Sequence, residues 1–216
     1  MPLFRSALAF ALASASLITP SLLAAKPAAE TPLSPDLAQV QTHLRSVSTM
    51  TAEFVQTNRD GATVSGTLQL KRPGKVRFQY QEGVPLLVVG DGKALIMVDY
   101  KVKQVSRWPV GNTPLGLLLN PEKDVGRYAR IVPSDAPDVV LVTDQKTHHR
   151  GYGSITVAFR RVAGAPGDLM LDGWTVLDAQ NNRTTVRLSD QRFNVPIDDS
   201  AFRWTDPRGV GPQHGR

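Results

Sequence analysis

The sequence predicts a mainly β (α+β) domain built on one large, strongly curved antiparallel sheet of about eleven short strands. Many short segments alternate apolar and polar side chains with a period of two, which is typical of strands that bury one face. Turn pairs such as Asp60-Gly61 and Asp91-Gly92 separate neighbouring segments at hairpin spacing. Only two or three short segments show helical spacing, and we expect these helices to lie on the concave side of the sheet.

The N-terminus is typical of a secretory signal peptide, which we assign to residues 1–25. Arg5 supplies the positive charge, residues 7–18 form an apolar stretch, and small residues precede the cleavage site. A membrane anchor is the alternative, but the apolar stretch is shorter than the roughly 20 residues that a spanning helix needs. We expect a flexible N-terminus at 26–33, one domain at 34–207 and a polar tail at 208–216.

Composition excludes several classes of function. The 216 residues include no cysteine, so thiolate catalysis, a cysteine metal site and acylation of the chain itself are excluded. The net charge is +6, about +5 without Arg5, and the basic residues are spread out, which does not favour a nucleic-acid partner. This charge fits either a solvated basic surface or attraction to an anionic membrane or acidic partner.

Catalytic and metal-binding patterns are also missing. His148 and His149 are adjacent, and neighbouring side chains of an extended segment point in opposite directions, so the pair is a poor chelate. No serine lies in a nucleophile elbow, and no glycine-rich loop opens a helix. We therefore expect a binding protein with no catalytic residue, no metal and no cofactor.

The first element of the mature chain is a helix that Ser34 caps and Pro35 begins. Its apolar residues recur at helical spacing and should form one stripe facing the core: Leu37, Val40, Leu44 and Val47. Its polar residues should face outward, and we expect a solvent-exposed His43 among Gln39, Gln41, His43 and Arg45.

The strands follow in order along the rest of the chain. We expect them at residues 49–59, 63–71, 75–81, 85–89, 94–100, 102–108, 127–132, 139–143, 154–160, 169–177 and 183–189, with a terminal piece at 202–204. The segments at 85–89 and 94–100 are apolar on both faces, so both faces should be covered.

The third of these strands carries the first candidate site. Val76, Phe78 and Tyr80 alternate with polar residues, and Arg72 stands at the corner before the turn pair Pro73-Gly74. We interpret this face as the wall of an apolar pocket that Arg72 helps to close. The alternatives are a plain core without a ligand and a solvated arginine at a strand end.

A short leucine-rich segment lies between the two groups of strands. Thr113 can cap a helix that Pro114 begins, and Asn120-Pro121 ends it after four leucines. So short and apolar a helix is not stable alone in water. It should therefore lie on the apolar strand faces.

Several motifs follow one another along the chain: Phe54-Val-Gln56, Gly66-Thr-Leu-Gln-Leu-Lys-Arg-Pro73, Asp91-Gly-Lys93 with Gln104-Val105, Gly111-Asn-Thr-Pro114 with the leucines, and Phe202 with Asp206-Pro207. In this order and spacing they resemble the LolA family of periplasmic carriers of outer-membrane lipoproteins. The resemblance extends from about Leu37 to Pro207. Phe78 stands where the family has a tryptophan, and the loops at 146–153 and 163–168 are not matched.

The resemblance implies an unclosed β-barrel covered by a helical lid, with a cavity for acyl chains. Arg72 matches the arginine that hydrogen-bonds lid carbonyls in the family and so latches the closed, empty form. The cavity would be lined by Phe54, Leu68, Leu70, Val76, Phe78, Tyr80, Val89 and Val98, and the lid helix would present Leu115, Leu118 and Leu119.

The function that this resemblance implies is a periplasmic chaperone that carries lipoproteins from the inner to the outer membrane. Its partners would be acylated lipoproteins, an ABC-type exporter in the inner membrane and an outer-membrane receptor where one exists. The chain itself would be a monomer and not an enzyme. The alternative on the same fold is a periplasmic carrier or sensor of another lipid, a glycolipid or a phospholipid.

Overall fold

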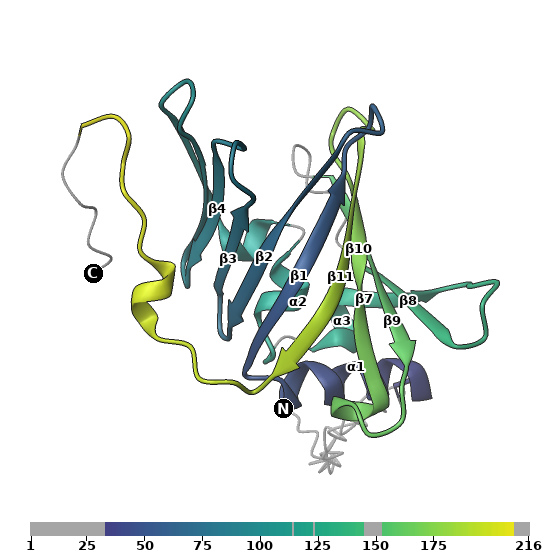
Figure 1. Cartoon of the computed structure of the whole chain (residues 1–216). Coiled ribbons are helices and arrows are strands. Elements are labelled where there is room, and N and C mark those ends of the chain that lie inside the picture. Colours follow the sequence, from purple (N-terminus) through teal and green to yellow (C-terminus); the bar gives the residue numbers. More distant parts are fainter. Residues whose placement is uncertain (1–32, 114, 123, 145–152, 210–216) are drawn as a thin grey trace, which may run out of the picture. The chain divides into compact units, whose positions relative to one another are not determined.

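The computed structural model describes residues 33–113, 115–122, 124–144 and 153–209 (Figure 1). The predicted signal peptide, residues 26–32, Pro114, the His148-His149 pair and residues 210–216 lie outside the described residues. Among the described residues, we find no helix with the length and hydrophobicity that a membrane-spanning helix requires.

Eleven strands form one antiparallel sheet, which confirms the predicted fold class. The sheet order is β6-β5-β4-β3-β2-β1-β11-β10-β9-β8-β7, so the barrel formed by the described strands is unclosed, with β6 and β7 at its two edges. The strands are β1 (Thr49–Thr57), β2 (Thr63–Lys71), β3 (Lys75–Tyr80), β4 (Leu86–Asp91), β5 (Ala94–Asp99), β6 (Gln104–Pro109), β7 (Ala129–Val132), β8 (Val139–Asp144), β9 (Ser154–Arg161), β10 (Leu169–Leu177) and β11 (Arg183–Phe193).

The helical elements are short apart from the first. They are α1 (Pro35–Ser46), η1 (Val110–Asn112), α2 (Gly116–Leu119), α3 (Val125–Tyr128), η2 (Pro166–Asp168) and η3 (Asp199–Phe202). Ser34 caps α1 as predicted, with its hydroxyl accepting from the Leu37 N–H. The predicted cap at Thr113 is wrong, because its hydroxyl donates to the Val110 carbonyl and closes η1, and α2 begins only at Gly116.

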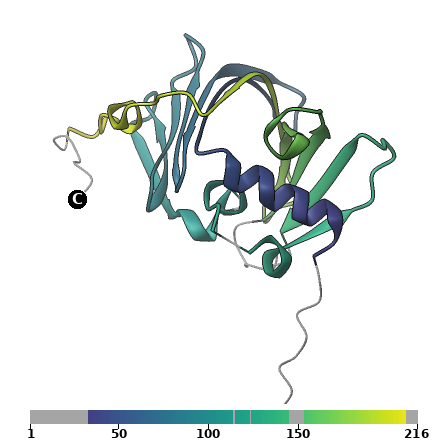
Figure 2. The ribbon, with the colours of Figure 1, turned by 90° about the horizontal axis from the view of Figure 1, so that it is seen from below.

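The sheet curves around α2 and α3, whereas α1 lies across the lower end of the sheet (Figure 1 and Figure 2). Two irregularities in strand pairing, at Thr51/Glu53 of β1 and at Leu171/Gly173 of β10, bend the sheet. As a result, the rings of Phe78 on β3 and Trp174 on β10 lie 5.9 Å apart, although three strands separate β3 from β10 in the sheet order. The concave face therefore closes on itself.

Apolar side chains are buried on both faces of β4 and β5, as predicted. The concave side joins the main core under the helices, whereas the convex side forms a second cluster with the C-terminal segment. The second cluster contains Leu87, Val89, Ala94, Ile96, Val98 and Phe202. The segment after β11 thus covers a surface that would otherwise be exposed and apolar.

The predicted terminal strand at 202–204 is wrong. Asp198 caps the 3₁₀ turn η3 instead, accepting from the Ser200 N–H at 2.8 Å. Asp199 then bonds Lys71 at 2.6 Å and Lys75 at 2.8 Å, and these hydrogen bonds lower its pKa to about 2. The segment is held by side chains of β2 and β3, not by strand pairing.

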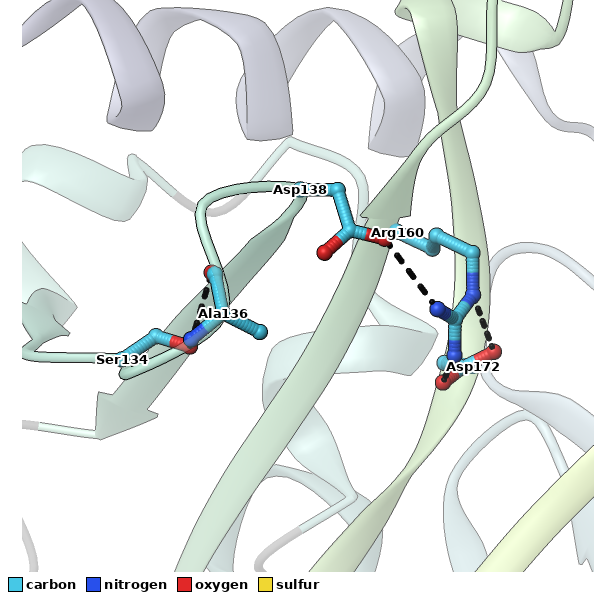
Figure 3. A network of polar contacts seen from close by, with 5 residues as sticks. All are labelled: Ser134, Ala136, Asp138, Arg160 and Asp172. Atoms are coloured by element: carbon cyan, nitrogen blue, oxygen red, sulfur yellow. Dashed lines mark hydrogen bonds and ion pairs between the residues drawn. The ribbon is translucent and has the colours of Figure 1, made fainter.

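A polar network lies on the outer face near the other edge of the sheet (Figure 3). Arg160 on β9 bonds Asp172 on β10 at 2.6 Å and Asp138, just before β8, at 3.2 Å. The Ser134 hydroxyl donates to the Ala136 carbonyl and closes the turn between β7 and β8. Because the Arg160 pairs are exposed to solvent, we expect each to contribute little to stability.

Candidate functional site

A pocket of about 340 Å³ lies on the concave face of the sheet. Strands from both halves of the sheet line it, together with the segment that leads into α2. Its lining residues are mostly apolar: Gln56, Phe78, Tyr80, Val88, Leu95, Trp108, Thr113, Leu115, Trp174, Val176, Thr184 and Val186. A concave, mostly apolar site with a few polar groups is the usual form of a small-molecule pocket.

The space beneath α2 is almost filled. Only about 10 Å³ remains between the sheet and the helix, roughly what one water molecule needs. Leu118 and Leu119 line this space, are fully buried and belong to the main core. Their side chains occupy concave surface that Leu68, Leu70 and Val76 would otherwise expose, so a larger ligand requires α2 to move.

Aromatic rings in edge-to-face contact form the wall of the pocket. Phe54 lies 5.5 Å from Phe78 and 5.3 Å from Tyr80, measured between ring centroids. The Tyr80 hydroxyl donates to Gln56 Oε1 at 2.9 Å, and burial raises the pKa of Tyr80 to about 12. The phenol is therefore neutral, and this end of the pocket is polar but uncharged.

Arg72 joins the sheet to α1 and α2, the two helices that we call the cover of the pocket. Its Nε donates to the Leu118 carbonyl in α2 at 2.8 Å, and its Nη1 donates to the carbonyls of Leu44 at 2.8 Å and Val47 at 2.6 Å, at the end of α1. Carbonyls at helix C-termini lack an intrahelical partner and carry the negative end of the helix dipole. Burial lowers the pKa of Arg72 to about 10, so the half-buried guanidinium remains charged at neutral pH.

The turn after Arg72 makes a further bond to the cover. The Gly74 N–H donates to the Leu119 carbonyl at 2.9 Å. Gly74 has a φ of 75°, and a Cβ there would lie 2.6 Å from the Gly92 carbonyl oxygen. Glycine is therefore required where this turn packs against the turn between β4 and β5.

The expectation that His43 is solvent-exposed is wrong. Its side chain is 1% exposed, packs edge-on against Phe159 and Phe193, and bonds the Pro166 carbonyl through Nδ1 at 2.8 Å. Burial lowers the pKa of His43 below its usual value, and the nearby Arg72 charge adds to this effect, whereas the Pro166 bond opposes it. The loop between β9 and β10 covers this polar side of α1.

Gly167 permits the close approach of this loop. A Cβ at Gly167 would lie 2.8 Å from the His43 backbone nitrogen, and φ is 64°. Arg161, at the end of β9, bonds Asp36 and Gln39 of α1 at 2.6 Å each. The insert at 163–168, which the family resemblance did not match, thus packs against α1 and helps to hold it in place.

Gln41 was also expected to face outward, and it is buried. Its Nε2 donates to the Pro121 carbonyl at 3.2 Å, and its Oε1 accepts from the Val125 N–H at 3.1 Å. One side chain of α1 thus bonds the segment that joins α2 and α3.

The predicted cavity residues fall into three places. Phe78 and Tyr80 line the pocket, and Phe54 supports both rings. Leu68, Leu70 and Val76 lie beneath α2, where they meet Leu115, Leu118 and Leu119. Val89 and Val98 were placed wrongly, because both lie in the cluster on the convex face.

The error at Val89 and Val98 comes from strand register. Phe78 pairs with Val88, and directly paired residues share a face of the sheet, so Val88 lines the pocket and Val89 does not. Sequence reasoning also missed Trp108 and Trp174. The inward residues of β10 follow a bulge, which shifts the alternation of the strand.

The arrangement suits binding more than group transfer. The described residues contain no group of three or more histidine or acidic side chains placed to hold a metal ion. The pocket brings together apolar walls, neutral polar groups at one end and a cover held by hydrogen bonds. Such a site can take up an apolar chain and shield it from water.

The chain is similar to several known proteins. The family described as "Outer membrane lipoprotein carrier protein LolA" matches residues 45–205. An outer-membrane lipoprotein carrier protein from Chromobacterium violaceum is 28% identical over 184 residues, covering 81% of this chain and 85% of that protein. One from Legionella pneumophila is 27% identical over 185 residues, covering 79% and 86%. Among solved structures, a DUF1329 family protein from Desulfovibrio piger superposes with a TM-score of 0.49 at 13% identity, covering 77% of this chain and 94% of that one.

Proposed function

The chain belongs to the LolA family of outer membrane lipoprotein carrier proteins, and we propose that it binds the acyl chains of lipoproteins and carries them across the periplasm to the outer membrane. The observation that carries the proposal is the position of Arg72. This single cation bonds the ends of both α1 and α2 above an apolar concave face.

A carrier of this kind has to solve two opposed problems. Acyl chains in water cost roughly 0.8 kcal/mol for each exposed CH₂ group, so the carrier must cover most of their length. It must also release them, and a cavity that binds them without opposition would hold them too tightly. A favourable closed, empty state supplies the opposing free energy.

The described geometry supports the proposal of such a closed state. The leucines of α2 fill the concave face where the apolar chains would lie, and Arg72 holds α2 in place. We propose that loading displaces α2, extends the 340 Å³ pocket beneath it and breaks the Arg72 bonds. Release is then favoured because re-closing restores the bonds and the packing of the leucines.

The cellular setting follows from the proposed cargo. The N-terminal 25 residues would direct the chain across the inner membrane and be removed. The donor would be an inner-membrane ABC-type lipoprotein exporter, and the acceptor an outer-membrane receptor where the cell has one. Transfer between them requires graded affinity and no covalent step.

The test is a release assay with matched variants. The purified mature protein is incubated with spheroplasts that retain newly made lipoproteins, and triacylated proteins in the soluble fraction are identified by mass spectrometry. Val88→Arg places a charge inside the pocket, whereas Val55→Arg adds the same charge on an exposed strand position. We expect Val55→Arg to release lipoproteins like the wild type and Val88→Arg to release almost none.

The same samples distinguish the alternative cargo. Triacylated protein bound to the wild type supports the carrier role. Recovery of phospholipid or glycolipid alone would move the function to a carrier of that lipid on the same fold. Equal lipoprotein release by the Val88→Arg variant would show that the pocket does not bind the cargo.

A further inference from the structure

The turn between β5 and β6 exposes large apolar side chains. Tyr100 is 39% exposed and Val102 is 63% exposed. Within the described ranges, the large hydrophobic residues exposed to this degree are Leu33, Val55, Tyr100 and Val102. Two of these four therefore lie within three residues of one turn, where their exposure requires an explanation.

The turn holds these side chains in a defined conformation. Asp99 Oδ1 accepts from the N–H groups of Lys101 at 2.9 Å and Val102 at 3.2 Å. Lys103 adopts a left-handed conformation, with φ of 53°. On the other side, the Tyr100 N–H donates to the Pro85 carbonyl at 2.8 Å. Val102 is thus exposed on a hydrogen-bonded turn, and the exposed Tyr100 ring has its hydroxyl directed at the Thr205 carbonyl of the C-terminal segment.

Positive charge accompanies the apolar groups. Lys101 and Lys103 flank Val102, both are exposed, and no ion pair of either is found among the described side chains. Arg203, also exposed, is two residues from Thr205, whose carbonyl is 3.5 Å from the Tyr100 hydroxyl. The acids nearby are Asp99 in the same turn and Glu82 in the neighbouring turn between β3 and β4, so the three cations exceed the acids by one.

The turn also lies at the end of the sheet where the polar part of the pocket is found. Successive strands run in opposite directions, so the turns after β1, β3 and β5 are at the same end. Gln56 and Tyr80, which line the pocket, are within two residues of this end of β1 and β3. The turn therefore lies at the same end of the sheet as these two polar residues, whereas the lining residues Leu95 and Trp108 lie at the other end of β5 and β6.

We propose that the β5–β6 turn, residues 100–103, docks the protein on an anionic lipid bilayer. Tyrosine is suited to the interface between headgroups and acyl chains, with its ring in the apolar layer and its hydroxyl toward water. Lysines beside it are attracted by anionic headgroups. The inference goes beyond the carrier role and does not depend on it, because binding to lipid vesicles is measured without lipoprotein.

The first experiment measures vesicle binding. The purified mature protein is sedimented with sucrose-loaded vesicles of phosphatidylcholine alone or of phosphatidylcholine with 30% phosphatidylglycerol, at low and physiological salt. We expect preference for the anionic vesicles, weaker at higher salt. Each lysine near an anionic surface contributes about fivefold in partitioning, so Lys101→Gln/Lys103→Gln should weaken binding by about 25-fold.

The control removes the same charge elsewhere. Arg187→Gln/Arg192→Gln neutralises two exposed cations of β11 and leaves the turn intact. We expect this variant to bind within about twofold of the wild type. An equal loss in both double variants would mean that only net charge matters, and wild-type binding by the lysine variant would show that the turn is not the contact. Either result overturns the proposal.

The second experiment detects insertion of the apolar groups. Because the chain has no cysteine, Val102→Cys accepts a single environment-sensitive fluorophore, and Val55→Cys is the matched exposed control. We expect a blue shift and quenching by brominated lipid for the label at 102 and neither for the label at 55. No shift at 102, or an equal shift at both positions, would overturn the proposal and would leave the carrier role untouched.

Discussion

Replacing Arg72 with leucine tests whether this residue holds the cover closed. The change places an apolar side chain at this corner and removes three hydrogen bonds to the carbonyls of Leu118, Leu44 and Val47. A hydrogen bond from a charged group contributes about 1.5–3 kcal/mol. The freed carbonyls can rehydrate in part, and the variant no longer buries a charge, so we take about 3 kcal/mol for the whole latch and not the sum of three bonds.

A loss of about 3 kcal/mol shifts the balance between closed and open forms by about two orders of magnitude. Hydrogen–deuterium exchange reports this directly. We expect amides of α1 and α2 to exchange about 100-fold faster in Arg72→Leu, while amides of β3 keep their protection. Lipoprotein should still load, but transfer to outer membranes should be slower because re-closing opposes binding less.

Arg77→Leu is the matched control. Arg77 also donates to backbone carbonyls, those of Ala201 at 3.3 Å and Arg203 at 2.9 Å, but on the convex face. Its loss should loosen the C-terminal segment and leave α1 and α2 protected. Unchanged exchange in Arg72→Leu, or equal loosening of α2 in both variants, would refute the latch.

Three further predictions concern the contacts that hold α1 against the loops around it. Burial lowers the pKa of His43 in the folded state, so the unfolded chain binds more protons than the folded chain below about pH 6.5. The free energy of unfolding should therefore decrease as the pH falls below this value, by up to about 1.4 kcal/mol per pH unit. Thermal melts between pH 7.5 and 5 should show this decrease in the wild type and a smaller one in His43→Gln. Gly167→Ala should lower stability by about 1–3 kcal/mol, whereas Gly164→Ala, also at positive φ but with open space around it, should cost less in the same denaturation experiment. Gln41→Leu removes two buried bonds and should cost about 1–3 kcal/mol, compared with a small change for the exposed Thr42→Val; equal losses in the two variants would contradict a bridging role for Gln41.

The helix α1 shows what hydrophobic periodicity alone predicts about burial and what it does not. The stripe of Leu37, Val40 and Leu44 faces the core as its spacing indicates. The opposite, polar side was expected to meet water, yet His43 and Gln41 are buried beneath other loops. Spacing identifies polar residues on a helix face, but it does not reveal that a distant loop supplies partners for them.

The strands β4 and β5 show the same limit for the pocket. Their apolar runs correctly indicated burial on both faces. With both faces apolar, alternation carries no information about which residues face the helices, so Val89 and Val98 were assigned to the wrong side. The pairing of Phe78 with Val88 shows which residues of β4 face the helices.

Local sequence patterns were enough to identify the elements of the fold: the alternation of β3, the turns at Asp60-Gly61 and Asp91-Gly92, the cap at Ser34, and the need for the leucines after Thr113 to lie on an apolar surface. These follow from local rules, because backbone geometry and hydrophobic period act over a few residues. These patterns do not identify the residues that line the pocket or the groups that Arg72 bonds. Both depend on strand register, bulges and contacts between segments far apart in the chain, where burial and hydrogen bonding are settled by partners that local sequence does not specify.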